Sequence, residues 1–149
     1  MDDDECRLCG VAAAGGAAGG WIAELAESIC VLGENQGCLG WCVVVLKEHV
    51  EHVAELSRSR QAALWEDVAA VAAAQRRLFG PVRINYECLG NVVPHIHWHL
   101  IPRHADDPDP KSPVWGWSAD RLRGTLDVSA RAELAGRIGL FLREHAQEG

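Results

Sequence analysis

The chain has 149 residues, a length that fits a single domain (1–149) with its own hydrophobic core. Hydrophobic residues make up 48% of it and charged residues 23%, the balance of an ordinary globular protein. The formal net charge of -7 argues against a nucleic acid polymer as partner. It does not argue against a small anionic ligand, because a few local donors can hold one phosphate.

The sequence also argues against a membrane or secreted protein. No apolar run approaches the roughly 20 residues that a bilayer span needs, and the acidic N-terminus has no basic region followed by an apolar stretch. We therefore expect a cytoplasmic protein, in which the six cysteines form no disulfide framework. Cys6 and Cys9 form a Cys-x-x-Cys pair, typical of a metal half-site or a redox pair. The other four are expected to be small buried hydrophobes: Cys30, Cys38, Cys42 and Cys88.

The first third of the chain is predicted to form strands. Residues 1–20 hold the cysteine pair, followed at 11–20 by a stretch rich in Gly and Ala that we expect to be a flexible connection. Apolar patterning predicts strands at 21–25, 29–32 and 41–46. Loops are expected at 33–40, which is rich in Gly, and at 47–56, which carries His49 and His52.

The clearest helix is predicted at 58–79, with Ser57 as its cap and Gly80-Pro81 as its end. Strands follow at 82–89 and 94–103, then a proline-rich loop at 106–113 and a second helix at 129–147. This order of elements predicts an α+β fold, an antiparallel sheet of about five strands with a long central helix and a C-terminal helix.

Three histidines alternate with apolar residues in the strand predicted at 94–103. Successive side chains of a strand point to opposite faces, so His95, His97 and His99 are expected on one face, with the apolar residues on the other. Each imidazole brings two polar nitrogens that need hydrogen-bond partners, so core packing alone does not explain three histidines in a row.

Three explanations compete for this histidine row. The strand is partly exposed and its histidines are accidental, or they bind a metal, as in small β-barrel metalloenzymes, or one is a nucleophile toward phosphorus that its neighbours hold in place. Neutral imidazole is abundant at pH 7 and nucleophilic, provided that its other nitrogen is anchored, for which a backbone carbonyl is the expected partner. The clean apolar alternation favours the nucleophile.

The segment His95–Ile101 resembles the His-φ-His-φ-His-φ-φ motif of the histidine-triad (HIT) superfamily, where φ is apolar. Pro102-Arg103 follows it, as is usual in that family, and the elements upstream occur in the family's order. The resemblance covers roughly residues 5–117. It points to the nucleotide hydrolase branch whose members carry a zinc-binding Cys-x-x-Cys.

The resemblance implies cleavage of nucleotides at the α-phosphorus. The substrates would be nucleoside phosphoramidates or dinucleoside polyphosphates. His97 would form a covalent nucleotidyl-histidine, His99 would stabilise the transition state, and His95 would complete the triad. The phosphate would contact Asn91, Asn85 and Gly90.

The resemblance also places the ribose and base at the loop 33–36. Gly33 stands where a ribose-contacting acid or amide is usual, so the contact would shift to Glu34 or Asn35. Trp41 stands where a histidine is common. Trp115 and Trp117 would cover a base by stacking or pack against the sheet.

A structural zinc ion is implied as well, held by Cys6, Cys9, His49 and His95, with His52 as the competing choice for His49. The chemical step would need no cofactor, and most members are homodimers, which we expect here. Three alternatives stay open: a nucleotidyltransferase, a nucleotide-binding regulator with little turnover, and a zinc-dependent lyase or dioxygenase.

Overall fold

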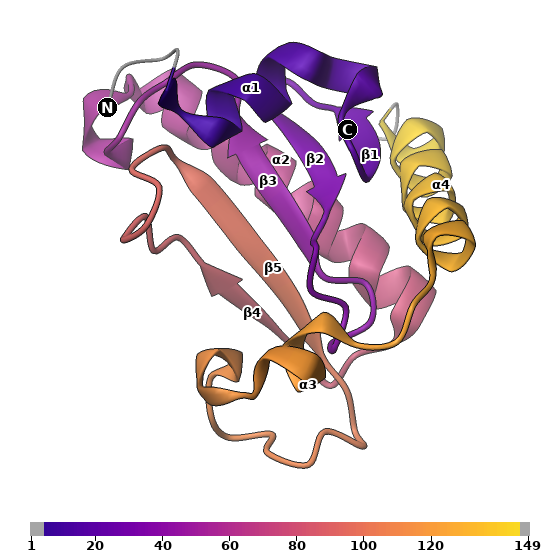
Figure 1. The fold of residues 1–149 in the computed structure, drawn as a ribbon. Helices are drawn as coiled ribbons and strands as arrows, with labels where there is room; N and C mark the ends of the chain where they lie inside the picture. Colours follow the sequence, from indigo (N-terminus) through magenta and orange to yellow (C-terminus); the bar gives the residue numbers. More distant parts are fainter. Residues whose placement is uncertain (1–4, 147–149) are drawn as a thin grey trace.

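A five-stranded antiparallel sheet forms the centre of the protein, in the strand order β1-β2-β3-β5-β4. The computed structural model describes residues 5–146. The strands are β1 (Trp21–Glu24), β2 (Ser28–Leu32), β3 (Cys42–Leu46), β4 (Arg83–Glu87) and β5 (His97–Arg103), as Figure 1 shows. The predicted α+β class and five-stranded sheet are confirmed.

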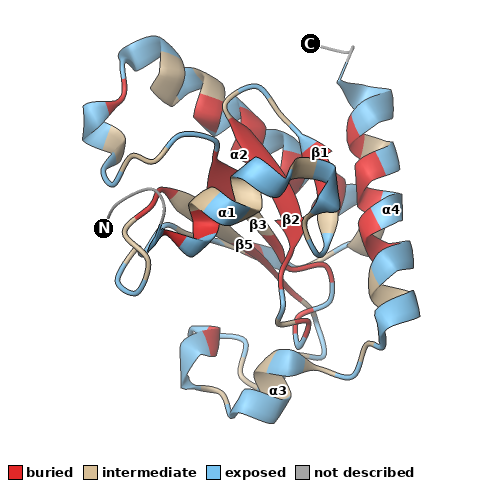
Figure 2. Cartoon of the chain, turned by 45° about the horizontal axis from the view of Figure 1, so that its top comes forward, coloured by how far each residue is buried: buried red, intermediate tan, exposed pale blue. Residues whose placement is uncertain are grey.

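The helices lie on both sides of this sheet (Figure 1). The two long helices, α2 (Arg58–Phe79) and α4 (Val128–His145), pack against one face, where the main core includes Cys30, Val44 and Leu100. The alternate residues of β2 and β3 form a second, smaller core on the other face. There they meet α1 (Arg7–Ala14), and the short α3 (Ala119–Arg123) leads into α4. Both faces of β2 are therefore buried, as Figure 2 shows.

The helix α2 has the predicted bounds because the sequence supplies both of its caps. The Ser57 hydroxyl accepts a hydrogen bond from the backbone N–H of Arg60, and Gly80 ends the helix in the left-handed conformation at φ 56°. The helix 129–147 is found as α4, beginning at Val128; its predicted end, Gln147, lies outside the described residues.

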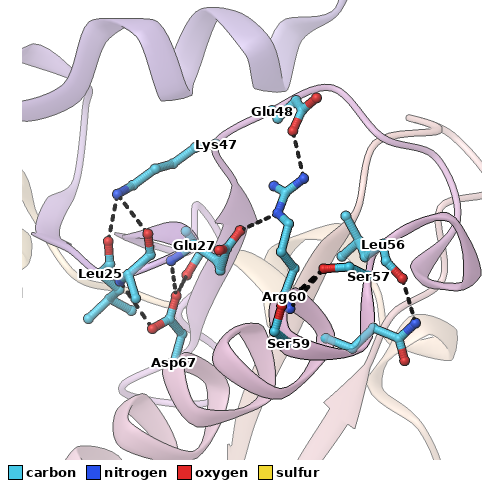
Figure 3. A network of polar contacts seen from close by, with 12 residues as sticks. Leu25, Glu27, Lys47, Glu48, Leu56, Ser57, Ser59, Arg60 and Asp67 are labelled. Carbon is cyan, nitrogen blue, oxygen red and sulfur yellow. Dashed lines mark hydrogen bonds and ion pairs between the residues drawn. The ribbon is translucent and has the colours of Figure 1, made fainter.

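A buried carboxylate joins α2 to the β1–β2 turn (Figure 3). Asp67 is 6% exposed and accepts hydrogen bonds from the backbone N–H groups of Ala26 and Glu27 and from the Ser28 hydroxyl. Nearby, the Arg60 guanidinium donates to Glu27 at 2.9 Å. These contacts fix the turn on the helix, because a buried carboxylate needs hydrogen-bond donors and the turn supplies three.

Two predictions, one for residues 11–20 and one for Cys88, are corrected. Residues 11–17, expected to be part of a flexible connection, are helical, since α1 continues to Ala14 and a short 3-10 helix, Gly15–Ala17, follows it. The buried side chain of Leu8 and the contacts of α1 with β3 give the helix a tertiary support that propensity does not show. Cys88 is exposed, unlike the other three cysteines expected to be buried.

The predicted strand 94–103 is too long at its start. A tight turn at Pro94, in which the N–H of His95 donates to the carbonyl of Val93 at 2.9 Å, precedes β5. Proline suits this turn because its fixed φ is close to the one the turn needs. The strand therefore begins at His97, but the side chain of His95 still lies on the α1 side of the sheet, against Cys6 and Cys9.

No helix within residues 5–146 combines the length and apolarity that crossing a membrane requires.

Candidate functional site

A pocket of about 450 Å³ opens on the α1 side of the sheet. Its walls come from α1, from β2 and β3, from the loops 33–35 and 89–93, and from the start of β5. Its polar lining residues are Arg7, Glu34, Asn35, Trp41, Asn91, His97, His99 and Trp115. His97 and His99 thus share one cavity, as predicted from alternation.

His97 is held by the backbone just before it. Its Nδ1 lies 2.6 Å from the carbonyl oxygen of His95, an acceptor only, so Nδ1 carries the proton. The Nε2 atom then carries the lone pair. In β5, the residue faces Val45 of β3 in the sheet register. In the neutral form of this imidazole the nucleophilic nitrogen is therefore Nε2.

His99 has the opposite arrangement. The indole Nε1 of Trp41 lies 3.1 Å from Nδ1 of His99. An indole N–H only donates, so Nδ1 of His99 accepts and Nε2 carries the proton. Burial, and then the nearby His97, lower the pKa of His99 to about 4. The rings of the two pocket histidines have centroids 5.2 Å apart. They offer a ligand two different groups: the lone pair on Nε2 of His97 and the N–H on Nε2 of His99.

Trp115 closes one side of this pair. Its ring lies edge-on to His99 at 5.2 Å and to Trp41 at 5.5 Å, and its indole N–H donates to Glu87 of β4. Trp115 lines the pocket, whereas Trp117 lies elsewhere, with the Arg121 guanidinium 3.5 Å from its ring centroid. Of the two tryptophans considered for base stacking, the pocket includes Trp115.

The residues expected to contact the nucleotide divide into two groups. Gly90, Asn91 and Asn35 line the pocket, and Gly90 has a φ of 69°, a conformation that favours glycine. Asn85 does not line it: its Oδ1 accepts a hydrogen bond at 3.0 Å from Arg103, a buried side chain that also binds Asp107. Asn85 belongs to the support of the loop after β5.

Two cysteines and two histidines meet beside the pocket. Their ligand atoms, in Cys6, Cys9, His49 and His95, all lie within 4.8 Å of one another. The Nδ1 of His95 is 3.5 Å from both sulfurs, and the Nδ1 of His49 is 3.3 Å from Cys9 Sγ. Nε2 of His95 lies 2.8 Å from the carbonyl oxygen of Leu46, which assigns it the proton and leaves Nδ1 to face the sulfurs.

This cluster fits a tetrahedral zinc ion. Zinc bonds of about 2.3 Å to sulfur and about 2.0 Å to nitrogen put neighbouring ligand atoms roughly 3.3–3.8 Å apart. The three distances at the cluster, 3.5, 3.5 and 3.3 Å, fall in that range. The carbonyl behind His95 is the kind of outer partner that orients metal-binding histidines. His52, the competing choice, is exposed and outside the cluster.

His95 therefore differs from the other two histidines of the motif. It is 1% exposed, and it lies in the cysteine–histidine cluster rather than in the pocket lining. Its carbonyl oxygen accepts the hydrogen bond from Nδ1 of His97. The sequence reasoning put all three imidazoles on one face, and His95 does lie on the same side of the sheet as His97 and His99. It contacts Cys6 and Cys9 there and does not line the pocket.

The sequence did not reveal that α1 forms a wall of the pocket. Leu8 and Val11 line the cavity from this helix, and Arg7 forms an ion pair of 3.7 Å with Glu34 across its mouth. Cys6 and Cys9 are three residues apart, and so are Leu8 and Val11. This i, i+3 spacing is the signal in the sequence that could have indicated the helix.

Comparisons with known proteins agree with this geometry. The family model described as the HIT domain matches residues 22–106. A histidine triad (HIT) protein from Sinorhizobium meliloti 1021 is 28% identical, with a TM-score of 0.71 over 79% of this chain and 85% of that one. No curated protein matches the sequence.

Two further solved structures share the fold across almost the whole chain. A hypothetical histidine triad nucleotide-binding protein from Sulfolobus tokodaii strain 7 is 19% identical, with a TM-score of 0.74 over 96% of this chain and 95% of that one. A Zn-bound histidine triad family protein from Mycobacterium smegmatis is 19% identical, with a TM-score of 0.69 over 99% and 100%. With the family model matching more than half of its residues, the chain belongs to the HIT domain family.

Proposed function

We propose that the protein is a nucleotide hydrolase that cleaves at the α-phosphorus through a covalent intermediate on His97. One observation carries this proposal: the carbonyl of His95 lies 2.6 Å from Nδ1 of His97, inside a cavity large enough for a nucleotide. This contact fixes the tautomer whose Nε2 is nucleophilic, which is what an activated histidine nucleophile requires.

The reaction proceeds in two displacements. In the first, the lone pair of His97 Nε2 forms a bond to the α-phosphorus, and the bond from phosphorus to the leaving group breaks with its electron pair. In the second, water attacks the phosphorus and the P–N bond returns its pair to Nε2. One proton of the water goes to solvent, and the nucleoside monophosphate leaves with the hydroxyl. His99 donates from Nε2–H to a phosphoryl oxygen as charge develops there.

The rest of the pocket divides between phosphate and nucleoside. Gly90 and Asn91 line it beside His97, where backbone and amide groups suit a phosphate. The apolar part, with Leu8, Val11 and Val31, suits a base, and Asn35 lies at the edge of the cavity for the ribose.

The test compares AMP release from diadenosine tetraphosphate and from an adenosine phosphoramidate. His97→Ala should lower the rate by at least about 1000-fold, by analogy with the loss of other covalent nucleophiles. His145→Ala, which changes an exposed histidine near the end of α4, is the matched control and should behave as wild type. Wild-type rates in His97→Ala would overturn the proposal. AMP binding without hydrolysis would favour the regulator, and transfer to phosphate would favour the transferase.

We propose further that zinc fills the cluster of Cys6, Cys9, His49 and His95 in a structural role. The donor set and spacing support this, as does the Zn-bound relative from Mycobacterium smegmatis. When bound, zinc would fix the N-terminal segment to the loop carrying His49 and to the residue before β5. None of the four ligands is needed elsewhere in the chemical step, apart from the backbone carbonyl of His95.

A second copy of the chain is the proposed partner. β4 is the last strand on its side of the sheet, so one of its edges has no strand partner within the described residues. Two exposed aromatic rings lie side by side there: Tyr86 of β4 and Trp65 of α2 are 42% and 51% exposed, with ring centroids 6.0 Å apart. Light scattering should give a dimer, and Tyr86→Asp should weaken it; a monomeric wild type would contradict the proposal.

A further inference from the structure

Trp41 has an unusual polar contact for a core residue. It is 1% exposed, yet its indole N–H reaches into the pocket and ends on Nδ1 of His99 at 3.1 Å. The ring also lies edge-on to His99, with centroids 5.7 Å apart. The pair joins the residue before β3 to the middle of β5.

The position of this indole is fixed by its surroundings. The backbone carbonyl of Trp41 accepts hydrogen bonds from the N–H of Gly33 and from the side chain of Gln36. A Cβ at Gly33 would come within 3.0 Å of the indole Cδ1, so glycine makes the room the ring needs. The indole N–H therefore has little freedom to turn away from His99.

This contact determines which proton His99 can carry. An imidazolium has N–H groups on both nitrogens. Protonation at Nδ1 would place one N–H against another and remove the only acceptor in the contact. The geometry thus disfavours the cation and keeps Nε2–H as a hydrogen bond donor. The lowered pKa of His99 agrees with this geometry.

We propose that Trp41 is a positioning residue that holds His99 as the neutral Nε2–H tautomer, and that the site consequently favours substrates whose leaving group departs as an anion. This inference rests on the proposed function of His97. It selects dinucleoside polyphosphates over alkylamine phosphoramidates.

The leaving group determines which substrate is cleaved faster, because a neutral imidazole is a poor acid and cannot readily protonate a basic leaving group. When a polyphosphate leaves, the P–O electron pair stays on an oxygen whose conjugate acid has a pKa of about 6, so no proton is needed. When an alkylamine leaves, the P–N electron pair must be accompanied by a proton, since an amide anion is too basic. His99 could supply that proton only as an imidazolium.

No other described residue of the pocket is suited to protonate an amine. The titratable side chains that line it are Arg7, Glu34, His97 and His99. Arg7 does not release its proton at neutral pH, and Glu34 is an exposed carboxylate at 3.7 Å from Arg7. His97 is the nucleophile. Beside His99 in the sheet register lies Glu87, whose carboxylate accepts from the Trp115 indole.

The direct test is the tautomer of His99, read from ¹⁵N chemical shifts of the free, zinc-loaded protein. Wild type should show an unprotonated Nδ1 and a protonated Nε2. Trp41→Phe, which keeps an aromatic ring but removes the N–H, should shift His99 toward the Nδ1–H form. Trp115→Phe is the matched control, because its indole contacts the same imidazole yet donates to Glu87, and it should leave the tautomer unchanged. A wild-type His99 protonated at Nδ1 overturns the proposal even if a variant fails to fold.

The second measurement is the ratio of kcat/KM for diadenosine tetraphosphate to kcat/KM for an alkylamine phosphoramidate of AMP. Wild type should prefer the polyphosphate, and Trp41→Phe should reduce the ratio by about 10-fold or more, since general acid catalysis is worth at least that much. A wild-type preference for the amine, or an unchanged ratio, contradicts the proposal. Full activity in His97→Ala would instead contradict the proposed function, leaving the tautomer result standing.

Discussion

Gly33 lies against the indole of Trp41 so closely that a Cβ on Gly33 would be 3.0 Å from Cδ1 and 3.1 Å from the carbonyl oxygen of Trp41. The contact explains why residue 33 is glycine: the indole of Trp41 leaves no room there for a side chain.

Gly33→Ala should therefore destabilise the fold by about 1–3 kcal/mol, as overpacking does in a close-packed interior. Gly136→Ala should do the opposite. Gly136 lies within the exposed side of α4 with nothing within 4 Å of its Cβ position, so alanine there should add about 0.5–1 kcal/mol. Urea unfolding measures both free energies. A Gly33→Ala protein as stable as wild type would show that the indole is not confined.

Asp67→Ala should lower the free energy of unfolding by about 2–4 kcal/mol, because it removes a buried side chain and leaves the Ser28 hydroxyl and two backbone N–H groups of the β1–β2 turn without their acceptor. The three hydrogen bonds, of 3.2, 2.9 and 2.7 Å, would all be lost. Glu66→Ala on the exposed side of the same helix is the control and should change stability little. Equal effects in the two variants would contradict the role given to Asp67.

Metal removal should weaken nucleotide binding as well as stability. Leu8 and Val11 line the pocket from α1, and the two cysteines of the zinc cluster lie at the start of that helix. Cys9→Ser should lower the zinc content and the Tm, and calorimetry should show weaker AMP binding. His52→Ala, which changes an exposed residue outside the cluster, should retain zinc. Wild type purified with intact thiols yet unable to bind zinc would contradict the site.

The stability contributed by His99 should depend on pH. Its pKa is lowered from 6.5 to about 4 in the folded protein, by burial first and by His97 second. Between these values the unfolded chain binds a proton that the folded chain does not, so stability falls as the pH drops through this window. The unfolding free energy of wild type relative to His99→Gln should be constant above pH 6.5 and decline toward pH 4. A constant difference across this range would contradict the lowered pKa.

The parts of this structure that the sequence predicted are those with local signals. The bounds of α2 follow from Ser57 and Gly80, and the sharing of one cavity by His97 and His99 follows from strand alternation. The parts that it did not predict depend on distant contacts. The helix α1 contains Ala and Gly and draws its support from packing on β3, and the start of β5 at His97 depends on the turn at Pro94.

Site residues were harder to predict for the same reason. Asn85 is an amide on the strand next to β5, which made it a candidate for phosphate binding, but its partner is the buried Arg103. The proton arrangement of His99 depends on Trp41, which is distant in sequence. Composition and spacing contain no information about which nitrogen carries the proton.

The most direct test of the central claim is to trap the covalent intermediate. The protein is mixed with diadenosine tetraphosphate labelled at the α-phosphorus, quenched in base within one turnover, and digested for mass spectrometry. The account predicts a nucleotidyl group on the peptide that contains His97, located at that residue, and no adduct in His97→Ala. An adduct on another residue, or AMP release by His97→Ala at the wild-type rate, would contradict it.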